Sequence, residues 1–335
     1  MKRILFVKLS DSSFVVQDEE ILKRHFQVTS YTFGTDKGFG LIINQFKMFY
    51  FLLLNIWKFD TIYIWFADFQ AFFPSLFSKI LSKNTIIILG GYDVAKIKSI
   101  SYGAHISTIR SWIIKISVRM ANQVLPVSNY VLEQAKLNIY KTVSEKSNVV
   151  YNAIDTDFFK YQAEEKKNTV VSVCGSNDMK RAELKGVLHF IKAAKSLPSI
   201  NFILIGIGNN IINKIKDLAP NNLEVTGFLL KDELREIYNT SKVVCQLSTI
   251  ESFGVAIAEA MACQCIPVVS NVGGLKEVVD TEGYRVDRED YEVVKSSIES
   301  AIVNYSEKHN FVDRYIQEKF SINNREVRLI EIVNS

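Results

Sequence analysis

The sequence predicts an α/β protein with two doubly wound parallel sheets, and three observations lead to this fold class. Short apolar runs rich in Ile, Val, Tyr and Phe alternate with helix-length segments along the whole chain. Several of these runs are apolar at consecutive positions, as expected for strands buried on both faces. The length of 335 residues, with 48% apolar and 23% charged residues, suits two domains with sizeable cores.

In the first half, a strand and a helix are expected at Ile4–Val7 and Val16–Phe26. Further strands are expected at Val28–Phe33, Thr61–Trp65, Thr85–Leu89 and Gln123–Val127.

The second half repeats this order of elements. Its expected strands are Thr169–Val173, Asn201–Ile205, Leu223–Val225, Val243–Leu247 and Ile266–Ser270. Its expected helices are Gly186–Ser196, Ile211–Asp217, Lys231–Thr240 and Gly254–Ala262.

The polar segment Lys160–Asn168 is the best candidate for a linker. We therefore expect an N-terminal domain over residues 1–160 and a C-terminal domain over residues 161–311. Two helices are expected within Phe311–Val333, and the last helix, about residues 312–335, is expected to pack back on the first domain. Two such sheets form a cleft between them, and ligands bind at the carboxyl ends of the strands.

The charges divide unevenly between the two halves. Residues 1–155 carry 18 Lys/Arg against 11 Asp/Glu, whereas the remaining residues carry 22 against 25. The four cysteines all lie in the second half, and their spacing fits neither a disulfide framework nor a zinc site. We expect them to be reduced core residues.

No export signal is apparent, because Ile4–Val7 provides only four apolar residues before Lys8. The most apolar stretch, Phe39–Trp57, is interrupted by Lys47 and leaves an uncharged run of ten residues, where a membrane span needs about 20. It is interpreted as a buried helix or one that rests on a membrane, in a cytoplasmic protein.

The segment from Ser248 to Ala262 is the most informative for chemistry. Glu251 follows an expected strand, Gly254 opens an expected helix, and Glu259 lies inside that helix among alanines. Amides at a helix N-terminus can hold a phosphate, and a glycine there lets a ligand approach closely. A carboxylate in an apolar setting needs a hydroxyl or amide partner, which a ribose would supply.

These residues resemble the signature of retaining nucleotide-sugar glycosyltransferases of family four, which have the GT-B fold of two Rossmann-like domains. The interdomain Tyr151–Asp155 motif, Val127-Ser128 before a helix, and Gly273-Gly274 followed by Glu277 match the same family. The resemblance covers most of the chain and is strongest from about Val149 to Asp280.

The resemblance assigns the donor to the second domain. It implies that Glu259 binds the ribose and Glu251 contacts the donor sugar. The remaining donor residues of the same loop and helix start are Ser252, Phe253, Gly254 and Val255.

A lysine that binds the diphosphate is implied at Lys185, which precedes Gly186 as in the family. The family arginine is replaced here by Ser176, and Arg181 is the candidate to supply the missing cation, because a guanidinium suits bidentate phosphate binding. The base pocket is expected at two glycine turns and a neighbouring ring: Gly206, Gly208, Gly227 and Phe228.

The acceptor side departs from the family pattern. The family histidine is absent from Gly90–Asp93, so only Asp93 remains, and His105 is considered as its substitute. The loop after the first strand lacks the usual double glycine, but Ser10, Ser12 and Ser13 offer hydroxyls and amides to an acceptor.

We expect neither a metal nor another cofactor besides the nucleotide sugar itself. Asp155-Thr156-Asp157 spells the Asp-x-Asp of metal-dependent glycosyltransferases, but it lies in the interdomain motif. The charge on the leaving diphosphate would then be neutralised by Lys185, Arg181 and the helix N-terminus.

The expected helix around Arg110, Lys115 and Arg119 also carries Trp112, Ile113 and Ile116. It is either an ordinary surface helix or a basic amphipathic face that rests on anionic lipid. Nucleic acid is not expected as a partner, because no binding motif for it is present.

The predicted function is a metal-independent, retaining transfer of a sugar from a nucleoside diphosphate to a lipid-linked or cell-surface glycan. A sugar-nucleotide epimerase on the same fold and a non-catalytic nucleotide-sugar-binding protein stay as alternatives, because fold alone does not exclude them.

Overall fold

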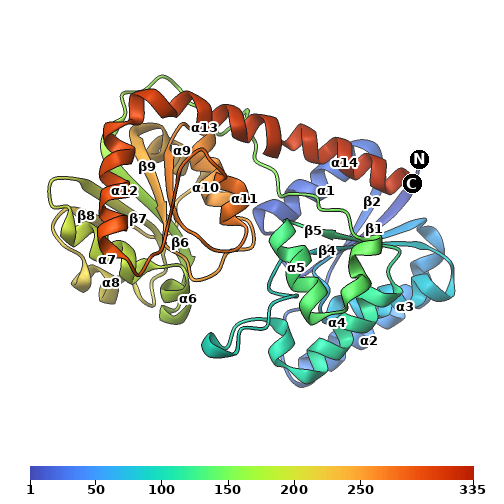
Figure 1. Ribbon diagram of the computed structural model, residues 1–335. Helices are drawn as coiled ribbons and strands as arrows, with labels where there is room; N and C mark the ends of the chain where they lie inside the picture. Colours follow the sequence, from blue (N-terminus) through green and yellow to red (C-terminus); the bar gives the residue numbers. More distant parts are fainter. The chain divides into compact units, whose positions relative to one another are not determined.

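The computed structural model describes residues 1–335, and the chain separates into two compact units (Figure 1). Unit 1 comprises Met1–Asn152 and Arg325–Ser335, and unit 2 comprises Ala153–Asn324. Each unit contains one parallel sheet. The predicted fold class is therefore confirmed.

Unit 1 is built on a five-stranded sheet in the order β2-β1-β3-β4-β5. All neighbouring strands run parallel. The strands are β1 (Arg3–Lys8), β2 (Gln27–Thr32), β3 (Thr61–Trp65), β4 (Asn84–Leu89) and β5 (Gln123–Pro126). Residues Ile4–Val7 and the whole of β3 are buried, as their consecutive apolar side chains predict.

The helices of unit 1 connect these strands in the usual crossover pattern. They are α1 (Ser13–His25), α2 (Phe39–Asn55), α3 (Phe72–Ile80), α4 (Thr108–Met120) and α5 (Asn129–Asn138). Short 3₁₀ turns lie at η1 (Ile56–Lys58), η2 (Phe69–Ala71), η3 (Lys98–Ile100), η4 (Ala104–Ile106) and η5 (Lys141–Lys146).

Unit 2 is built on a six-stranded parallel sheet in the order β11-β10-β9-β6-β7-β8. Its strands are β6 (Lys167–Ser176), β7 (Asn201–Ile207), β8 (Leu223–Val225), β9 (Ser241–Gln246), β10 (Ile266–Ser270) and β11 (Tyr284–Val286). Its helices are α6 (Met179–Leu184), α7 (Val187–Ser196), α8 (Ile212–Leu218), α9 (Lys231–Thr240), α10 (Val255–Ala262), α11 (Leu275–Val279), α12 (Tyr291–Val303) and α13 (Tyr305–Phe320).

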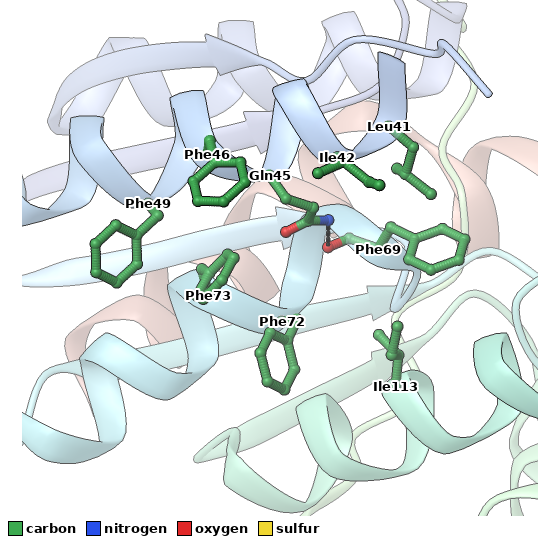
Figure 2. A pocket seen from close by; sticks show the side chains of 9 residues that line it. All are labelled: Leu41, Ile42, Gln45, Phe46, Phe49, Phe69, Phe72, Phe73 and Ile113. Carbon is green, nitrogen blue, oxygen red and sulfur yellow. Dashed lines mark hydrogen bonds between the residues drawn. The ribbon is translucent and has the colours of Figure 1, made fainter. Parts of the chain in front are cut away.

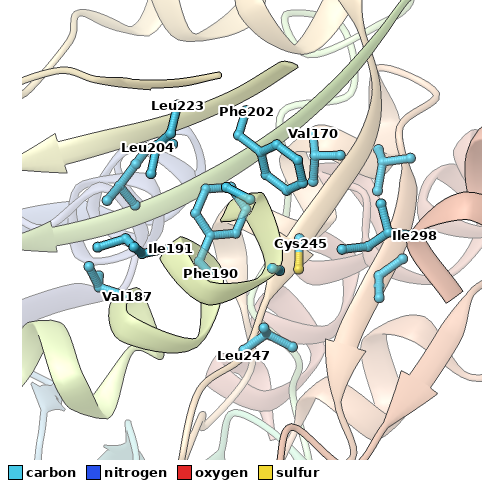
Figure 3. Close-up of a cluster of buried hydrophobic side chains, with 14 of the residues drawn as sticks. Val170, Val187, Phe190, Ile191, Phe202, Leu204, Leu223, Cys245, Leu247 and Ile298 are labelled. Atoms are coloured by element: carbon cyan, nitrogen blue, oxygen red, sulfur yellow. The ribbon is translucent and has the colours of Figure 1, made fainter. Parts of the chain in front are cut away.

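The core of unit 2 packs helices against its sheet. In Figure 3, Phe190 of α7 lies beside Phe202 of β7, and their ring centroids are 5.4 Å apart in an edge-to-face arrangement. Ile298 of α12 and Cys245 of β9 belong to the same buried cluster. All four cysteines are buried free thiols, as expected from the sequence.

The last helix, α14 (Ile322–Asn334), returns the chain to unit 1. Arg325 is buried there and makes two hydrogen bonds to Asp18, at 2.5 and 2.8 Å, and further ones to the carbonyl oxygens of Val150 and Tyr151. Lys2 donates to Val333 at 2.7 Å, so the two chain ends lie side by side (Figure 1).

Two expectations about the chain's organisation need correction. The expected boundary at residue 160 lies inside unit 2, which begins at Ala153. The expected linker, Lys160–Asn168, packs on that unit. Gln162 N donates to Asn239, and the Lys166 ammonium donates to the carbonyl oxygens of Tyr238, Ser241 and Cys263. The alternative of a buried helix at Phe39–Trp57 is also wrong, since most of this stretch is exposed.

By length and apolar composition alone, the stretch Phe39–Lys58 reaches what a membrane-crossing helix needs. Only 22% of it is buried inside the molecule. One side nevertheless packs into unit 1, where Met48 and Leu52 are fully buried. This stretch is therefore an integral part of a folded α/β domain.

Candidate active site

The candidate site of unit 2 lies at the carboxyl ends of β6 and β9. The chain runs from β6 outward through β7 and β8 and then returns to the other side of β6 at β9. In a doubly wound sheet, the crevice at such a reversal is where ligands bind. The loop after β6 leads to Arg181 and Lys185, and the loop after β9 carries Glu251 and Ser252.

Lys185 and Glu251, 66 residues apart in the chain, are brought into direct contact. The lysine ammonium donates to Glu251 Oε2 at 2.5 Å, and their side chains are 25% and 16% exposed. The pair is thus partly shielded and still reachable from solvent. A diphosphate arriving here would compete with Glu251 for the ammonium group.

Two glycines shape the loop that carries Glu251. Gly273 has φ +51°, and a Cβ placed on it would come within 2.0 Å of the Glu251 carbonyl oxygen. Gly274 N donates to that oxygen at 2.9 Å. The Gly-Gly turn after β10 therefore fixes the backbone of Glu251, which gives a physical reason for these two residues.

The start of α10 directly follows the loop that carries Glu251. Gly254 is the N-cap, with φ +104°, and no side chain caps this helix end. Phe253 is buried and stacks edge-to-face on Phe320, while Val255 is half-buried. Backbone amides and the helix dipole at such an end favour an anion.

Glu259 is half-buried in α10, and its carboxyl group has no hydrogen-bond partner. Burial raises the pKa of its carboxyl to about 8, and Lys231 offsets part of this increase. The carboxyl is consequently mostly protonated at neutral pH in the free protein. An unpartnered, partly buried carboxyl of this kind is suited to a ligand that brings hydroxyl groups.

The predicted base pocket residues also come together. Gly206 N donates to Gly227 O at 2.9 Å, and Gly208 N donates to Ser176 O at 2.8 Å. Phe228 is 60% exposed, so its ring lies outside the core and is available for stacking.

Arg181 lies on α6, a short helix that the sequence patterns do not predict. Asp178 accepts from its backbone amide at 2.8 Å and so caps this helix. The guanidinium is exposed and makes no ion pair. It is a cation near the end of β6, but nothing fixes its orientation.

The acceptor-side candidates in unit 1 divide into buried and exposed residues. Asp93 is buried and accepts from Ala67 N and Gly91 N, and burial raises the pKa of its carboxyl to about 6. His105 is 3% exposed, its Nδ1 bonds Ser111 Oγ at 2.8 Å, and burial, with Lys115 nearby, lowers its pKa to about 4. Asp93 thus holds two backbone amides, whereas His105 bonds the Ser111 side chain. The role of His105 as a substitute for the absent family histidine stays a prediction.

The three serines follow β1, next to the chain reversal of the first sheet between β1 and β3. Ser10 and Ser12 lie within hydrogen-bond distance of each other at 3.1 Å, and Ser13 is exposed at the start of α1. The serine hydroxyls are accessible, whereas the side chains of Asp93 and His105 are buried. This loop is therefore the more suitable acceptor contact of the two groups.

Two positioning residues were missed by the sequence reasoning. Gln246 donates to the Lys185 carbonyl oxygen at 3.2 Å, and Arg288 donates to Thr249 Oγ1 at 2.8 Å. A polar residue at the end of a buried strand is a detectable signal for Gln246. Arg288 comes from the distant loop after β11, so local sequence patterns give no sign of it.

The fold and this arrangement of residues define an α/β protein of the GT-B class. Residues 153–318 match the family model described as glycosyl transferases group 1. This segment is a group 1 glycosyltransferase domain, so the predicted resemblance to nucleotide-sugar glycosyltransferases is confirmed. The enzyme class predicted from the sequence, a glycosyltransferase, agrees with this match.

Individual relatives and a solved structure agree with this assignment. The chain is 30% identical over 177 residues to an uncharacterized glycosyltransferase of Methanocaldococcus jannaschii, covering 48% of this chain and 45% of that protein. It is 27% identical over 211 residues to the O-antigen chain mannosyltransferase RfbU of Salmonella typhimurium, covering 61% and 56%. Anabaena HepE, solved in complex with UDP, superimposes with a TM-score of 0.79 at 16% identity over 100% of both chains.

The matches cover about half the length of these curated relatives. The similarity to HepE, at its low identity, defines the fold.

Proposed function

We propose that this protein moves a sugar from a nucleoside diphosphate to a hydroxyl group of a lipid-linked or cell-surface glycan. The transfer would retain the anomeric configuration and need no metal. It would take place on the cytoplasmic side, with the protein peripherally bound to an anionic membrane through its basic first half. The observation that carries the proposal is the contact between Lys185 and Glu251 at the reversal point of the second sheet.

The donor's charged end would bind between the cations and the start of α10. The Lys185 ammonium would exchange Glu251 for a diphosphate oxygen, and the amides at Phe253–Val255 would add further hydrogen bonds. Arg181, which is exposed and without an ion pair, can swing toward the same charge. The released Glu251 carboxylate would then accept a hydrogen bond from a hydroxyl of the donor sugar.

Glu259 and the glycine turns would hold the nucleoside. The Glu259 carboxyl has no protein partner and would accept hydrogen bonds from the ribose hydroxyls. Gly227 leaves room for the base beside the exposed ring of Phe228, since a Cβ there would meet only the Ile207 carbonyl oxygen at 3.9 Å. Gly206 and Gly208 instead let Gly175 and Asn177 approach closely.

In the reaction, the bond between the sugar C1 and the diphosphate oxygen breaks with its electron pair leaving on the diphosphate. The acceptor hydroxyl oxygen forms the new bond to C1 from the same face, and its proton passes to the leaving diphosphate. Lys185, Arg181 and the α10 amides stabilise the negative charge that develops on the leaving group.

The acceptor class draws on one relative. RfbU is named as an O-antigen chain mannosyltransferase, and O-antigen chains are glycans. The exposed hydroxyls of Ser10 and Ser13, and the half-buried one of Ser12, would offer hydrogen bonds to such an acceptor.

The direct test is incubation with a panel of UDP-, GDP- and ADP-sugars, with and without lipid-linked glycan acceptors. Release of nucleoside diphosphate that depends on the acceptor is the expected result. An isomerised nucleotide sugar formed without acceptor would instead identify an epimerase. Binding of a nucleotide sugar without any turnover across the panel would identify a non-catalytic binding protein.

A further inference from the structure

Helix α2 carries more exposed large apolar side chains than any other element of the protein. In this helix every exposed position is apolar or aromatic except Lys47. The most exposed of these side chains are Phe39 at 76%, Phe46 at 70% and Tyr50 at 63%. A surface helix in a protein surrounded by water is expected to be polar on this side.

A pocket of about 460 Å³ lies between this helix and its neighbours (Figure 2). In the figure, Phe46 and Phe49 of α2 face Phe72 and Phe73 of α3 across it, and Ile113 of α4 closes one side. Gln45 is the only polar lining residue, and its amide nitrogen is occupied by the Phe69 carbonyl oxygen at 2.8 Å. The chemistry of this pocket suits a hydrocarbon chain.

The net charge of the segment that carries this surface indicates which kind of partner the surface binds. Residues 37–120, which span α2, α3 and α4, carry 10 Lys/Arg against 3 Asp and no Glu, a net charge of +7. This equals the whole excess of the first half. Two of the three aspartates, Asp60 and Asp68, are already paired with Arg3 and Arg110. The segment that carries the apolar surface therefore has an excess of positive charge, which a second copy of the same surface would repel and an anionic lipid surface would attract.

The aromatic residues support a membrane rather than a protein partner. Trp57 and Trp112 are 61% and 60% exposed, and they flank this region at η1 and on α4, whereas the third tryptophan, Trp65, is fully buried. Exposed Trp and Tyr beside apolar side chains are typical of groups that sit at the headgroup level.

We propose that the α2–α4 surface docks on an anionic phospholipid bilayer and that its pocket takes up one lipid hydrocarbon chain. The helix lies in the plane of the interface and does not span the bilayer, because its Met48 and Leu52 side is part of the core of unit 1. This proposal names the surface through which the protein would bind the membrane. It rests on the membrane partner given in the proposed function but does not depend on the transfer reaction.

The docking is tested by sedimentation of the full chain with vesicles of phosphatidylglycerol and phosphatidylcholine, and with phosphatidylcholine alone. We expect binding to the anionic vesicles, weakening with salt, and a blue shift of tryptophan emission from Trp57 and Trp112. The double variant Phe46→Asp/Leu54→Asp should bind the vesicles more weakly, by about tenfold or more for each substitution. In the unmodified protein both apolar side chains pass from water into the membrane on binding, and this contribution would be lost. The control Leu137→Asp changes a side chain that is 77% exposed on α5 and should bind as the unmodified protein does.

The pocket is tested with chain-brominated lipids, which quench nearby indoles. Phe72→Trp on a Trp57→Phe/Trp112→Phe background should be quenched, whereas the background protein, which keeps only the buried Trp65, should not be. Unquenched emission of the Phe72→Trp protein on bound vesicles would overturn the assignment of the pocket. Protein that stays in solution with anionic vesicles at low salt would overturn the docking. A dimer in solution that the α2 substitutions convert to a monomer, with no vesicle binding, would assign the surface to a second copy and overturn it too.

Discussion

At the scale of single residues, the function depends on a few charged side chains whose partners change on donor binding. Lys185 and Glu251 neutralise each other in the free protein, so neither is left as an uncompensated charge in a partly shielded place. The diphosphate would take over the lysine and free the carboxylate. The same contact thus stabilises the empty site and prepares it for the donor.

Replacing Lys185 by Met should separate phosphate binding from nucleoside binding. We expect the affinity for a nucleoside diphosphate to fall about 10- to 100-fold, as for the loss of one charge-assisted hydrogen bond. Affinity for the corresponding nucleoside, which has no phosphate, should stay the same. Calorimetric titration with both ligands measures this, and an equal loss for both would mean that the variant has a damaged fold.

Glu259 should couple nucleotide binding to pH. Burial raises the pKa of its carboxyl to about 8, so the free protein holds this proton at neutral pH. If ribose hydroxyls donate to the ionised carboxylate, binding near pH 7 releases about one proton, and affinity rises with pH toward about 8. Calorimetry in two buffers of different ionisation enthalpy measures the release.

Glu259→Gln is the matched control, and it should bind with no such proton release and with a flat pH dependence in this range. The pH dependence of folding stability has the opposite sign to that of nucleotide affinity. The folded state binds this proton more tightly than the unfolded state does, so the contribution of Glu259 to the free energy of unfolding falls as pH rises from about 4.5 to about 8. Proton release that is unchanged in the variant would contradict the role given to Glu259.

At the scale of elements, most strands and helices could be predicted because their apolar periodicity is strong. Strand β3 and helix α9 have the bounds that the sequence indicates. What could not be predicted depends on distant contacts. Strand β11 is three residues long and pairs with β10. Helix α6 is a separate case: its cap, Asp178, is local, but its six residues are too few to give a periodic pattern.

The same distinction applies to the candidate site. The positions of Glu251, Gly254 and Glu259 on a loop and helix follow from local sequence. The contact of Glu251 with Lys185, and the burial of Asp93 and His105, depend on how separate segments pack. Local patterns contain no information on those contacts.

The Gly-Gly turn after β10 should be sensitive to one added methyl group. Gly273→Ala would force a Cβ against the Glu251 carbonyl oxygen in a backbone region that costs about 1–3 kcal/mol for other residues. We expect loss of transfer together with lower thermal stability.

The control for this change is Gly38→Ala. Gly38 also has positive φ, at +59°, but a Cβ there meets nothing within 4 Å. It should show the backbone cost alone and keep activity, as measured by thermal unfolding and turnover. Full activity of Gly273→Ala would show that the turn does not position Glu251.

Helix α14 is anchored by one buried ion pair. Arg325→Met would leave the Asp18 carboxylate in the core with only the Tyr63 and Trp65 donors, at 2.6 and 3.0 Å. We expect a loss of about 3–5 kcal/mol in the free energy of unfolding, measured by urea denaturation. Arg328→Met, on the exposed side of the same helix, should change it by less than about 0.5 kcal/mol. Similar small losses for both variants would show that the ion pair does not anchor α14.

At the scale of the whole molecule, the uneven charge of the two halves reflects two different tasks. In unit 2, whose part of the chain is acidic on balance, a local group of cations and a helix start would bind the donor. In unit 1, the excess positive charge belongs to the segment that contains α2, α3 and α4, next to the apolar surface. Net charge therefore indicates where the protein works, and the local cations indicate what it binds.

The central claim, that Glu251 takes part in sugar transfer from a nucleotide bound to unit 2, is tested most directly by measuring binding and turnover on the same variants. For Glu251→Ala we predict a turnover at least about a hundredfold lower, with nucleoside diphosphate affinity within about threefold of the unmodified protein. Glu133→Ala, which removes an exposed carboxylate in unit 1, should leave both unchanged. Full sugar transfer by Glu251→Ala would contradict the claim.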